Sequence, residues 1–202
     1  MTMIKFLLLT TTIFFLSTFI MAQGAAPGAG DQSASTGKYA LNAFLVVTPE
    51  QCKLEHKKRG EKFKVGEPVC SAAEETAKQA FQQFTRVETV PEKGTDPNKI
   101  ILTFKFVDLD ATTTITAFGK RKMVMLLEWT ATDSAGKVFW VQTVEGTTEE
   151  PAGNIFTYKK HKTKMIDEAK TDLIAKSVKA MRESPEFQKI AQKATVGSNV
   201  SQ

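Results

Sequence analysis

The sequence predicts an α+β fold, in which a mainly antiparallel sheet carries two helices packed on one of its faces. Several short stretches alternate apolar and polar residues with the period of a strand, and two longer stretches have the apolar period of a helix. Four β-rich stretches follow one another between the two helical ones, which is the arrangement typical of α+β domains. The predicted order of elements is β-α-β-β-β-β-α.

The first half of the domain is predicted to hold a strand, a helix and a short second strand. Apolar residues at alternate positions indicate a strand over 39–48. A helix is predicted over 71–84, because Ser71 and Glu74 have the spacing of a capping box, in which side chains satisfy the free N–H groups of the first turn. A short strand over 86–90 follows it.

The second half begins with the four β-rich stretches, over 100–110, 112–118, 122–132 and 137–148. The third of them has apolar residues on both faces, which predicts a central strand that is covered on both sides. The residues that separate it from the fourth stretch, Asp-Ser-Ala-Gly, have the composition of a hairpin turn.

A second long helix is predicted over 163–182 from a stripe of apolar residues at helical spacing. Ser184 and Pro185 then have the residue types preferred at the N-cap and the first position of a helix. A short additional helix should therefore begin there.

Residues 1–22 have the three parts of a secretory signal peptide. Lys5 supplies the positive charge, residues 6–21 form the apolar segment, and Ala22 offers a small residue for cleavage. Cleavage two or three residues later, or retention as an uncleaved anchor, are the alternatives. A cleaved chain would be periplasmic or secreted and would carry no transmembrane span.

The remaining chain is predicted to form a single α+β domain over 39–194. Residues 23–38 are rich in Gly, Ala and Ser and have no apolar periodicity, so they should form a flexible linker. Residues 195–202 have a similar composition and are predicted to be a disordered tail.

The two cysteines, Cys52 and Cys70, are predicted to form a disulfide, because an exported chain meets oxidising conditions. Closing a loop of this size would stabilise the fold by about 3 kcal/mol in the chain-entropy model. The two histidines, His56 and His161, belong to no cluster with metal-ligand spacing. No metal ion or cofactor is therefore predicted.

Two basic runs are candidates for binding. One lies inside the predicted disulfide loop and the other precedes the second long helix. The simpler interpretation is a solvated surface, and the functional one is a surface for anionic lipid, lipopolysaccharide or cell-wall polymer. Few aromatic residues are interleaved with them, so nucleic acid is not expected as a partner. The candidate residues are Lys57, Lys58, Arg59, Lys159, Lys160 and Lys162.

No motif of a catalytic site is present in the sequence. It contains no Gly-rich phosphate loop after a strand, no G-x-S-x-G and no H-E-x-x-H. Asp108 and Asp110 lie near the end of a predicted strand, where Asp usually forms turns, and Glu128 interrupts an apolar strand, where it could pair with Lys105. We predict no catalytic residues.

The hairpin in the second half carries a recognisable pattern. The segment KMVMLLEWTATDSAGKVFWVQTVEGTT contains W-x-x-x-D-x-x-G-K followed by W-x-x-T-x-x-G. It follows VGEPVCSAAEETAKQAFQQFTRVETV and IILTFKFVDLD, and precedes an amphipathic helix. The matching residues are Trp129, Asp133, Gly136, Lys137, Trp140, Thr143 and Gly146.

This succession of elements, over about 39–181, resembles the small bacterial envelope proteins of the YajG type and the lipopolysaccharide-assembly accessory lipoproteins. The resemblance implies a β-α-β-β-β-α layout and an accessory or assembly role with no catalytic residues. The chain departs from these families because no cysteine lies near the cleavage site, the first being Cys52. Lipid attachment through an N-terminal cysteine is therefore not expected.

Three functional hypotheses follow. The first is an exported envelope accessory protein with a non-catalytic binding or assembly role, whose partner is another envelope component: a protein, a lipid or an anionic polymer. The second is a periplasmic carrier that holds an apolar ligand between the sheet and the helices. The third is an envelope enzyme that uses carboxylates alone, for example on glycans.

Overall fold

The computed structural model describes residues 37–113, 119–151 and 158–199. The predicted signal peptide, most of the predicted linker and part of the predicted strand over 112–118 lie outside these residues. The described residues form a five-stranded sheet, a two-stranded sheet and four helices, which confirms the α+β class.

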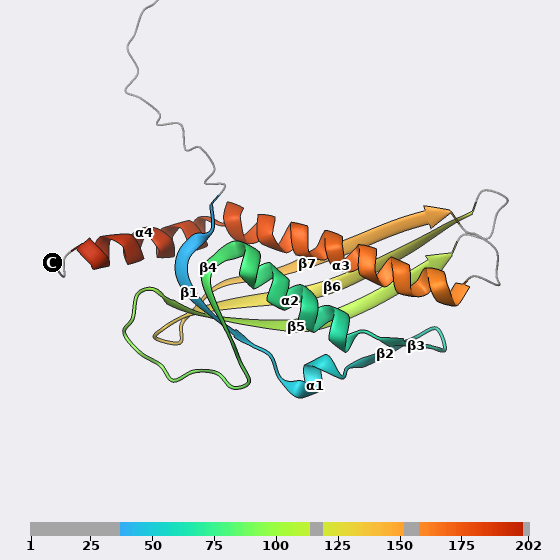
Figure 1. Cartoon of the computed structure of the whole chain (residues 1–202), viewed down its shortest axis with the longest axis horizontal. Helices are drawn as coiled ribbons and strands as arrows, with labels where there is room; N and C mark the ends of the chain where they lie inside the picture. The colour runs from blue at the N-terminus through green and yellow to red at the C-terminus, as the bar shows by residue number, and fades with distance from the viewer. Residues whose placement is uncertain (1–36, 114–118, 152–157, 200–202) are drawn as a thin grey trace, which may run out of the picture. The chain divides into compact units, whose positions relative to one another are not determined.

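The large sheet is mainly antiparallel, as predicted (Figure 1). Its strand order is β4-β1-β5-β6-β7, with β1 parallel to both of its neighbours and the remaining pairs antiparallel. The parallel pairs arise because the chain makes a long connection, which includes a helix, between β1 and β4. The strands are β1 (Tyr39–Val46), β4 (Phe81–Val87), β5 (Lys99–Thr113), β6 (Lys120–Asp133) and β7 (Val138–Pro151).

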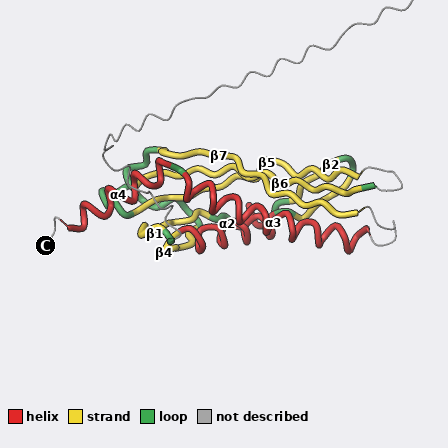
Figure 2. The backbone as a smooth tube through the Cα atoms, turned by 90° about the horizontal axis from the view of Figure 1, so that it is seen from above, coloured by secondary structure: helices red, strands yellow, loops and turns green. Residues whose placement is uncertain are grey.

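Two helices cover one face of this sheet, as predicted. Helix α2 (Gly66–Ala80) and helix α3 (Tyr158–Glu183) lie along the same side of the long strands (Figure 2). Helix α4 (Pro185–Asn199) follows after Ser184, whose Oγ accepts a hydrogen bond from the N–H of Phe187 at 3.3 Å. Ser184 thus begins the helix as predicted, and α4 continues beyond Ala194 to Asn199.

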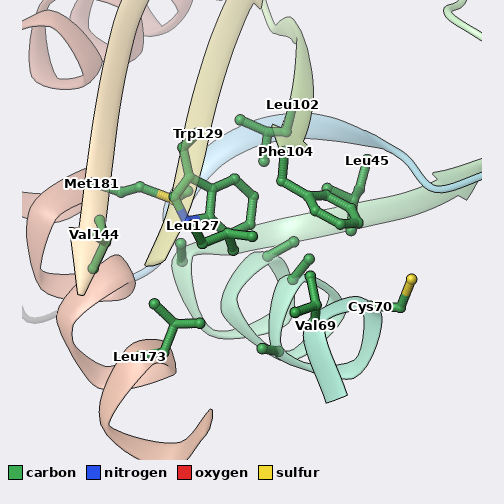
Figure 3. Packing of buried hydrophobic residues seen from close by; sticks show 14 of the residues in the cluster. Leu45, Val69, Cys70, Leu102, Phe104, Leu127, Trp129, Val144, Leu173 and Met181 are labelled. Atoms are coloured by element: carbon green, nitrogen blue, oxygen red, sulfur yellow. The ribbon is translucent and has the colours of Figure 1, made fainter. Parts of the chain in front are cut away.

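The core lies between the sheet and the helices (Figure 3). Trp129 at its centre is fully buried, and its Nε1 donates a hydrogen bond to Ser177 Oγ of α3 at 3.1 Å. Phe187 of α4 packs its ring on Phe81 and Trp140, with ring centroids 5.8 and 5.1 Å away. Side chains from every layer therefore meet in one continuous cluster.

Strand β5 contains a bulge and runs on through Ala111, where a break between two strands was predicted. Pairing of β5 with β6 shifts between Phe106 and Asp108, so that Phe106 lies opposite Leu127 and Leu109 lies opposite Met125. The extra residue returns Leu109 to the helix-facing side, where it is fully buried. The register shift thus lies before Ala111, which pairs regularly with Met123, and because β5 is continuous through Thr113, the predicted break at Ala111 is wrong.

Helix α2 differs from its prediction at both ends. It begins at Gly66 rather than Ser71, and its N-cap residue Val65 makes no side-chain hydrogen bond. Ser71 therefore lies inside the helix and does not cap it. The helix ends at Ala80, because Phe81 is extended and buried at the start of β4. Phe81 has the spacing of the helix's apolar stripe, but its burial in the core as part of β4 ends the helix before it.

Three short elements precede α2 and were not predicted. Helix α1 (Pro49–Cys52) begins with a capping box between Thr48 and Gln51, whose side chains each accept a hydrogen bond from the other residue's backbone N–H. Strands β2 (Glu55–Lys58) and β3 (Glu61–Lys64) form the separate two-stranded sheet. These strands carry the basic run at 57–59.

We predict that Gly146→Ala destabilises the protein by about 1–3 kcal/mol. Helix α3 approaches β7 so closely here that a Cβ atom would meet the carbonyl oxygen of Ala169 and lie 2.5 Å from Leu173 Cβ. Urea denaturation would measure the loss. Gly94→Ala is the control, because nothing lies within 4 Å of its added Cβ. Equal stability of the two variants would contradict the close contact.

Candidate functional site

The 55–64 hairpin, formed by β2 and β3, is the local structure on which the candidate site is built. Its turn places Arg59 and Gly60 at φ values of 51° and 81°. Positive values at both central residues are those of a tight hairpin turn that matches the twist of its strands. Glu55 pairs with Lys64, and Lys57 pairs with Lys62.

Alternation along the two strands gives the hairpin two chemically different faces. One face contains His56, Lys58, Glu61 and Phe63, which are half-buried or buried. The opposite face contains Glu55, Lys57, Lys62 and Lys64, and all four are exposed.

The buried face is held against β5 by Asp108. This carboxylate accepts a hydrogen bond from Lys58 Nζ, and its Oδ1 lies 3.0 Å from His56 Nε2. The hydrogen bond from Lys58 holds the pKa of Asp108 below its ordinary value. The His56 ring also packs edge-on against Phe106, with centroids 5.3 Å apart. Asp108 therefore ties the hairpin to the sheet and does not form a turn.

The same face is held against α3 by Lys162. Its Nζ lies 3.1 Å from Glu61 Oε2 and from the carbonyl oxygen of Lys62, and 3.6 Å from the centroid of the Phe63 ring. Phe63 itself is only 3% exposed. The structure thus brings the two basic runs of the sequence together at one end of the sheet.

The predicted binding residues fall into three groups. Lys58 and Lys162 are partly buried and form ion pairs with Asp108 and Glu61, so they do not belong to an open surface. Arg59 is exposed and lies 3.7 Å from Asp110. Lys57 is exposed, as expected. Lys159 and Lys160 lie in α3, and their side chains are outside the described part of the structure.

The exposed face adds two lysines that were not predicted, Lys62 and Lys64. Together with Lys57 they form the lysine face. Glu55 lies opposite Lys64 on this face, but among the described residues no ion pair within 4 Å joins any of the three lysines to a carboxylate. Lys57 and Lys62 are direct cross-strand neighbours, an arrangement of like charges that destabilises a hairpin. The sequence signal for this face is the turn dipeptide Arg59-Gly60 between two short stretches. A hairpin predicted from it would have placed Lys57, Lys62 and Lys64 on one face.

A disulfide between Cys52 and Cys70 closes the segment that contains the hairpin, which confirms the predicted pairing. The two Cα atoms are 5.6 Å apart and belong to α1 and α2. Gly66 begins α2 against the backbone of Cys52 and Leu54, where a Cβ atom would collide. The base of the hairpin is therefore fixed by a covalent bond and by close backbone packing.

The beginning of α3 adds positive charge next to the hairpin. No acidic residue lies in its first turn, although carboxylates there would stabilise the helix dipole. Glu150 of β7, only 8% exposed, lies 2.9 Å from His161 Nδ1 and 3.5 Å from Lys164 Nζ. The helix is thus attached to the sheet by the His161–Glu150 contact and the Lys164–Glu150 ion pair, and its N-terminal end lies beside the hairpin, where Lys162 contacts Glu61.

Glu128, another acidic residue considered in the sequence, has a cross-strand neighbour of opposite charge. Glu128 lies opposite Lys105 in the β5–β6 pairing, as the sequence suggested. Within the described ranges, no group of three or more His, Cys, Asp or Glu residues is arranged to hold a metal ion. None of the described helices is both long and apolar enough to cross a membrane.

No protein-family model and no curated protein matches the sequence. Among solved structures, a minor lipoprotein from Acinetobacter baumannii is similar with a TM-score of 0.46 and 8% identity, covering 72% of this chain and 93% of that one. A hypothetical protein from Chlamydia trachomatis has a TM-score of 0.46 and 6% identity, covering 71% and 96%. A protein from Xanthomonas campestris has a TM-score of 0.40 and 9% identity, covering 83% and 91%.

Of these three, the Acinetobacter baumannii protein is described as a lipoprotein, and with TM-scores below 0.5 these similarities assign no function to this chain. The resemblance to the YajG type and to the lipopolysaccharide-assembly proteins stays a prediction from the sequence.

We predict that Asp108→Asn destabilises the protein by about 1 kcal/mol at neutral pH and that this difference disappears in acid. Because the folded-state pKa of Asp108 is lowered, its stabilisation is complete above the ordinary value of 3.8 and is lost as the pH falls through the lowered value. Denaturant titrations between about pH 6 and pH 2 would measure it.

Glu55→Gln is the matched control, since Glu55 lies on the exposed face of the same hairpin. Its effect at neutral pH should be small, because exposed charges contribute little to stability. An Asp108→Asn difference that persists unchanged in acid would show that the Lys58–Asp108 ion pair does not anchor the hairpin.

Proposed function

We propose that this chain is an exported accessory protein of the bacterial envelope, which binds an anionic envelope component through the lysine face of the 55–64 hairpin. The proposal assigns it a non-catalytic binding role. Export rests on the signal-peptide pattern at residues 1–22 and is supported by the disulfide.

The single observation that carries the binding role is the contrast between the two faces of the hairpin. On the buried face, Lys58 is matched by a carboxylate of the sheet. On the exposed face, Lys57 and Lys62 are neighbours without such a match among the described residues, at a cost to stability. An anionic partner would relieve the repulsion between Lys57 and Lys62.

The field around the hairpin favours the same kind of partner. The chain has a net charge of +5, and the hairpin alone carries five Lys and Arg residues against two Glu residues. The positive end of α3 lies beside it, tied to it through Lys162. Positive charge concentrated in this way attracts anionic surfaces and polymers.

A carrier of an apolar ligand between sheet and helices would need space in the interior. In the described part of the molecule, large side chains fill that layer, among them Trp129, Leu127 and Leu173 (Figure 3). The carboxylate of Asp108 holds the hairpin in place through Lys58, and that of Asp110 lies 3.7 Å from the exposed Arg59 of the hairpin turn. Neither alternative hypothesis therefore has a specific observation in its favour.

We predict that replacing Lys57, Lys62 and Lys64 together by Gln abolishes binding to phosphatidylglycerol vesicles or to lipopolysaccharide. Binding of the unaltered protein should weaken steeply with added salt, because exposed charges are screened over about 8 Å at physiological ionic strength. The thermal midpoint should stay the same or rise slightly, since like-charge repulsion is removed. Vesicle co-sedimentation and thermal unfolding would measure both effects.

The control replaces Lys78, Lys189 and Lys193 by Gln, which removes the same charge from exposed positions on α2 and α4. This variant should bind almost normally. Equal loss of binding in the two variants would mean that only net charge matters, and binding that survives in the lysine-face variant would exclude the proposed site.

A further inference from the structure

A groove opens where β1 and β5 separate. The two strands pair only as far as Leu45 and Leu102, and the next residues of the β1 side turn away into α1. From Phe104 onward, this edge of β5 is not paired with β1; Gln51 of α1 bonds to Phe104, and β2 lies alongside the strand. We call the space between these elements the fork groove.

The edge of β5 inside this fork is closed to strand addition at two points. Gln51 Nε2 donates a hydrogen bond to the carbonyl oxygen of Phe104 at 3.0 Å. Asp108 Oδ1 accepts the N–H of Leu109 at 2.8 Å. Because side chains already satisfy these backbone groups, an added β-strand is not the occupant that the groove favours.

The fork groove is mainly apolar and has a volume of about 330 Å³. Leu54, Val69, Phe104 and Phe106 line it together with Gln51 and Lys105. Leu54 is one of the few large apolar side chains left open, with 39% exposure. This volume is at the lower end of the range for small-molecule sites, roughly 300–1,000 Å³, which suits part of one acyl chain and not a whole lipid.

The walls of the groove are fixed in advance. The Cys52–Cys70 disulfide joins α1 to α2, and Leu54 and Val69 lie close to these cysteines in the chain. The carbonyl oxygen of Leu54 also accepts the N–H groups of Val65 and Gly66 at 3.1 and 3.0 Å. A preformed apolar site loses little entropy when it is filled.

One cationic side chain lines this apolar site, and a lysine of the lysine face belongs to a backbone segment beside it. The hydrogen bonds of Leu54 place it beside the end of β3, which carries Lys64 of the lysine face, and Lys105 lines the groove itself. Glu50 also lines it, so a negative headgroup would be oriented toward the lysines and away from α1. The combination suits an anionic amphiphile better than a soluble polyanion.

We infer that the fork groove takes up part of one acyl chain of an anionic phospholipid while the lysine face binds its headgroup. This inference rests on the proposed function and specifies its partner as a lipid at a membrane surface. Since the groove holds only part of one acyl chain, the protein docks on the bilayer surface and does not extract the lipid from it.

The test places a reporter in the groove with Leu54→Trp. The native residues Trp129 and Trp140 are buried, at 0% and 6% exposure, so they give a constant background. With phosphatidylglycerol vesicles whose acyl chains carry bromine, the fluorescence of the introduced indole should shift to the blue and be quenched. Val141→Trp is the control, because Val141 is 56% exposed on β7 and lies outside the groove.

A second variant, Leu54→Asn, should weaken vesicle binding roughly fivefold without weakening the binding of soluble glycerol 1-phosphate. It also covers the case in which Leu54→Trp does not fold. Equal quenching at positions 54 and 141, or unchanged vesicle binding by Leu54→Asn, would overturn the inference.

The two proposals fail in distinguishable ways. If the lysine-face variant loses vesicle binding while position 54 stays unquenched, the proposed function stands and the lipid-chain inference is wrong. If the unaltered protein binds lipopolysaccharide or cell-wall polymer but not phosphatidylglycerol vesicles, the partner is a different anion and the lipid-chain inference is again wrong. If it binds none of them, both proposals are wrong.

Discussion

The Cys52–Cys70 disulfide is the constraint on which the candidate site depends. An isolated two-stranded hairpin is at best marginally stable in water, so the 55–64 hairpin needs support from outside itself. The disulfide fixes its base between α1 and α2, while Asp108 and Lys162 hold its buried face against β5 and α3. The lysine face is thus presented by a rigid frame, although it takes no part in the main sheet.

Strand alternation explains why a strongly basic segment serves two purposes at once. Residues of one face, such as Lys58, neutralise carboxylates of the sheet and stabilise the fold. Residues of the other face, such as Lys57 and Lys62, repel each other and contribute nothing evident to stability. When the basic run is treated as one group of residues, the difference between its two faces is missed. The difference becomes visible only when the hairpin and its register are known.

The sequence allowed much of the fold to be predicted, because the periods of strands and helices persist wherever an element has one buried face. Thr163 to Arg182 was predicted as helical on that basis, and the structure confirms and extends it. The start of α2 was not predictable, since it is set by contact between Gly66 and the backbone of Cys52. For the site, the sequence predicted Lys57 as a candidate binding residue. It could not show that Lys58 and Lys162 form ion pairs within the fold, because their partners, Asp108 and Glu61, are distant in the chain.

The most direct test of the central claim is amide chemical-shift mapping of the ¹⁵N-labelled protein during titration with phosphatidylglycerol nanodiscs. Binding through the lysine face predicts that changes are concentrated at 55–64 and at the beginning of α3, and that added salt reverses them. Changes confined to the outer face of β6 and β7, with the hairpin amides unaffected, would contradict the account.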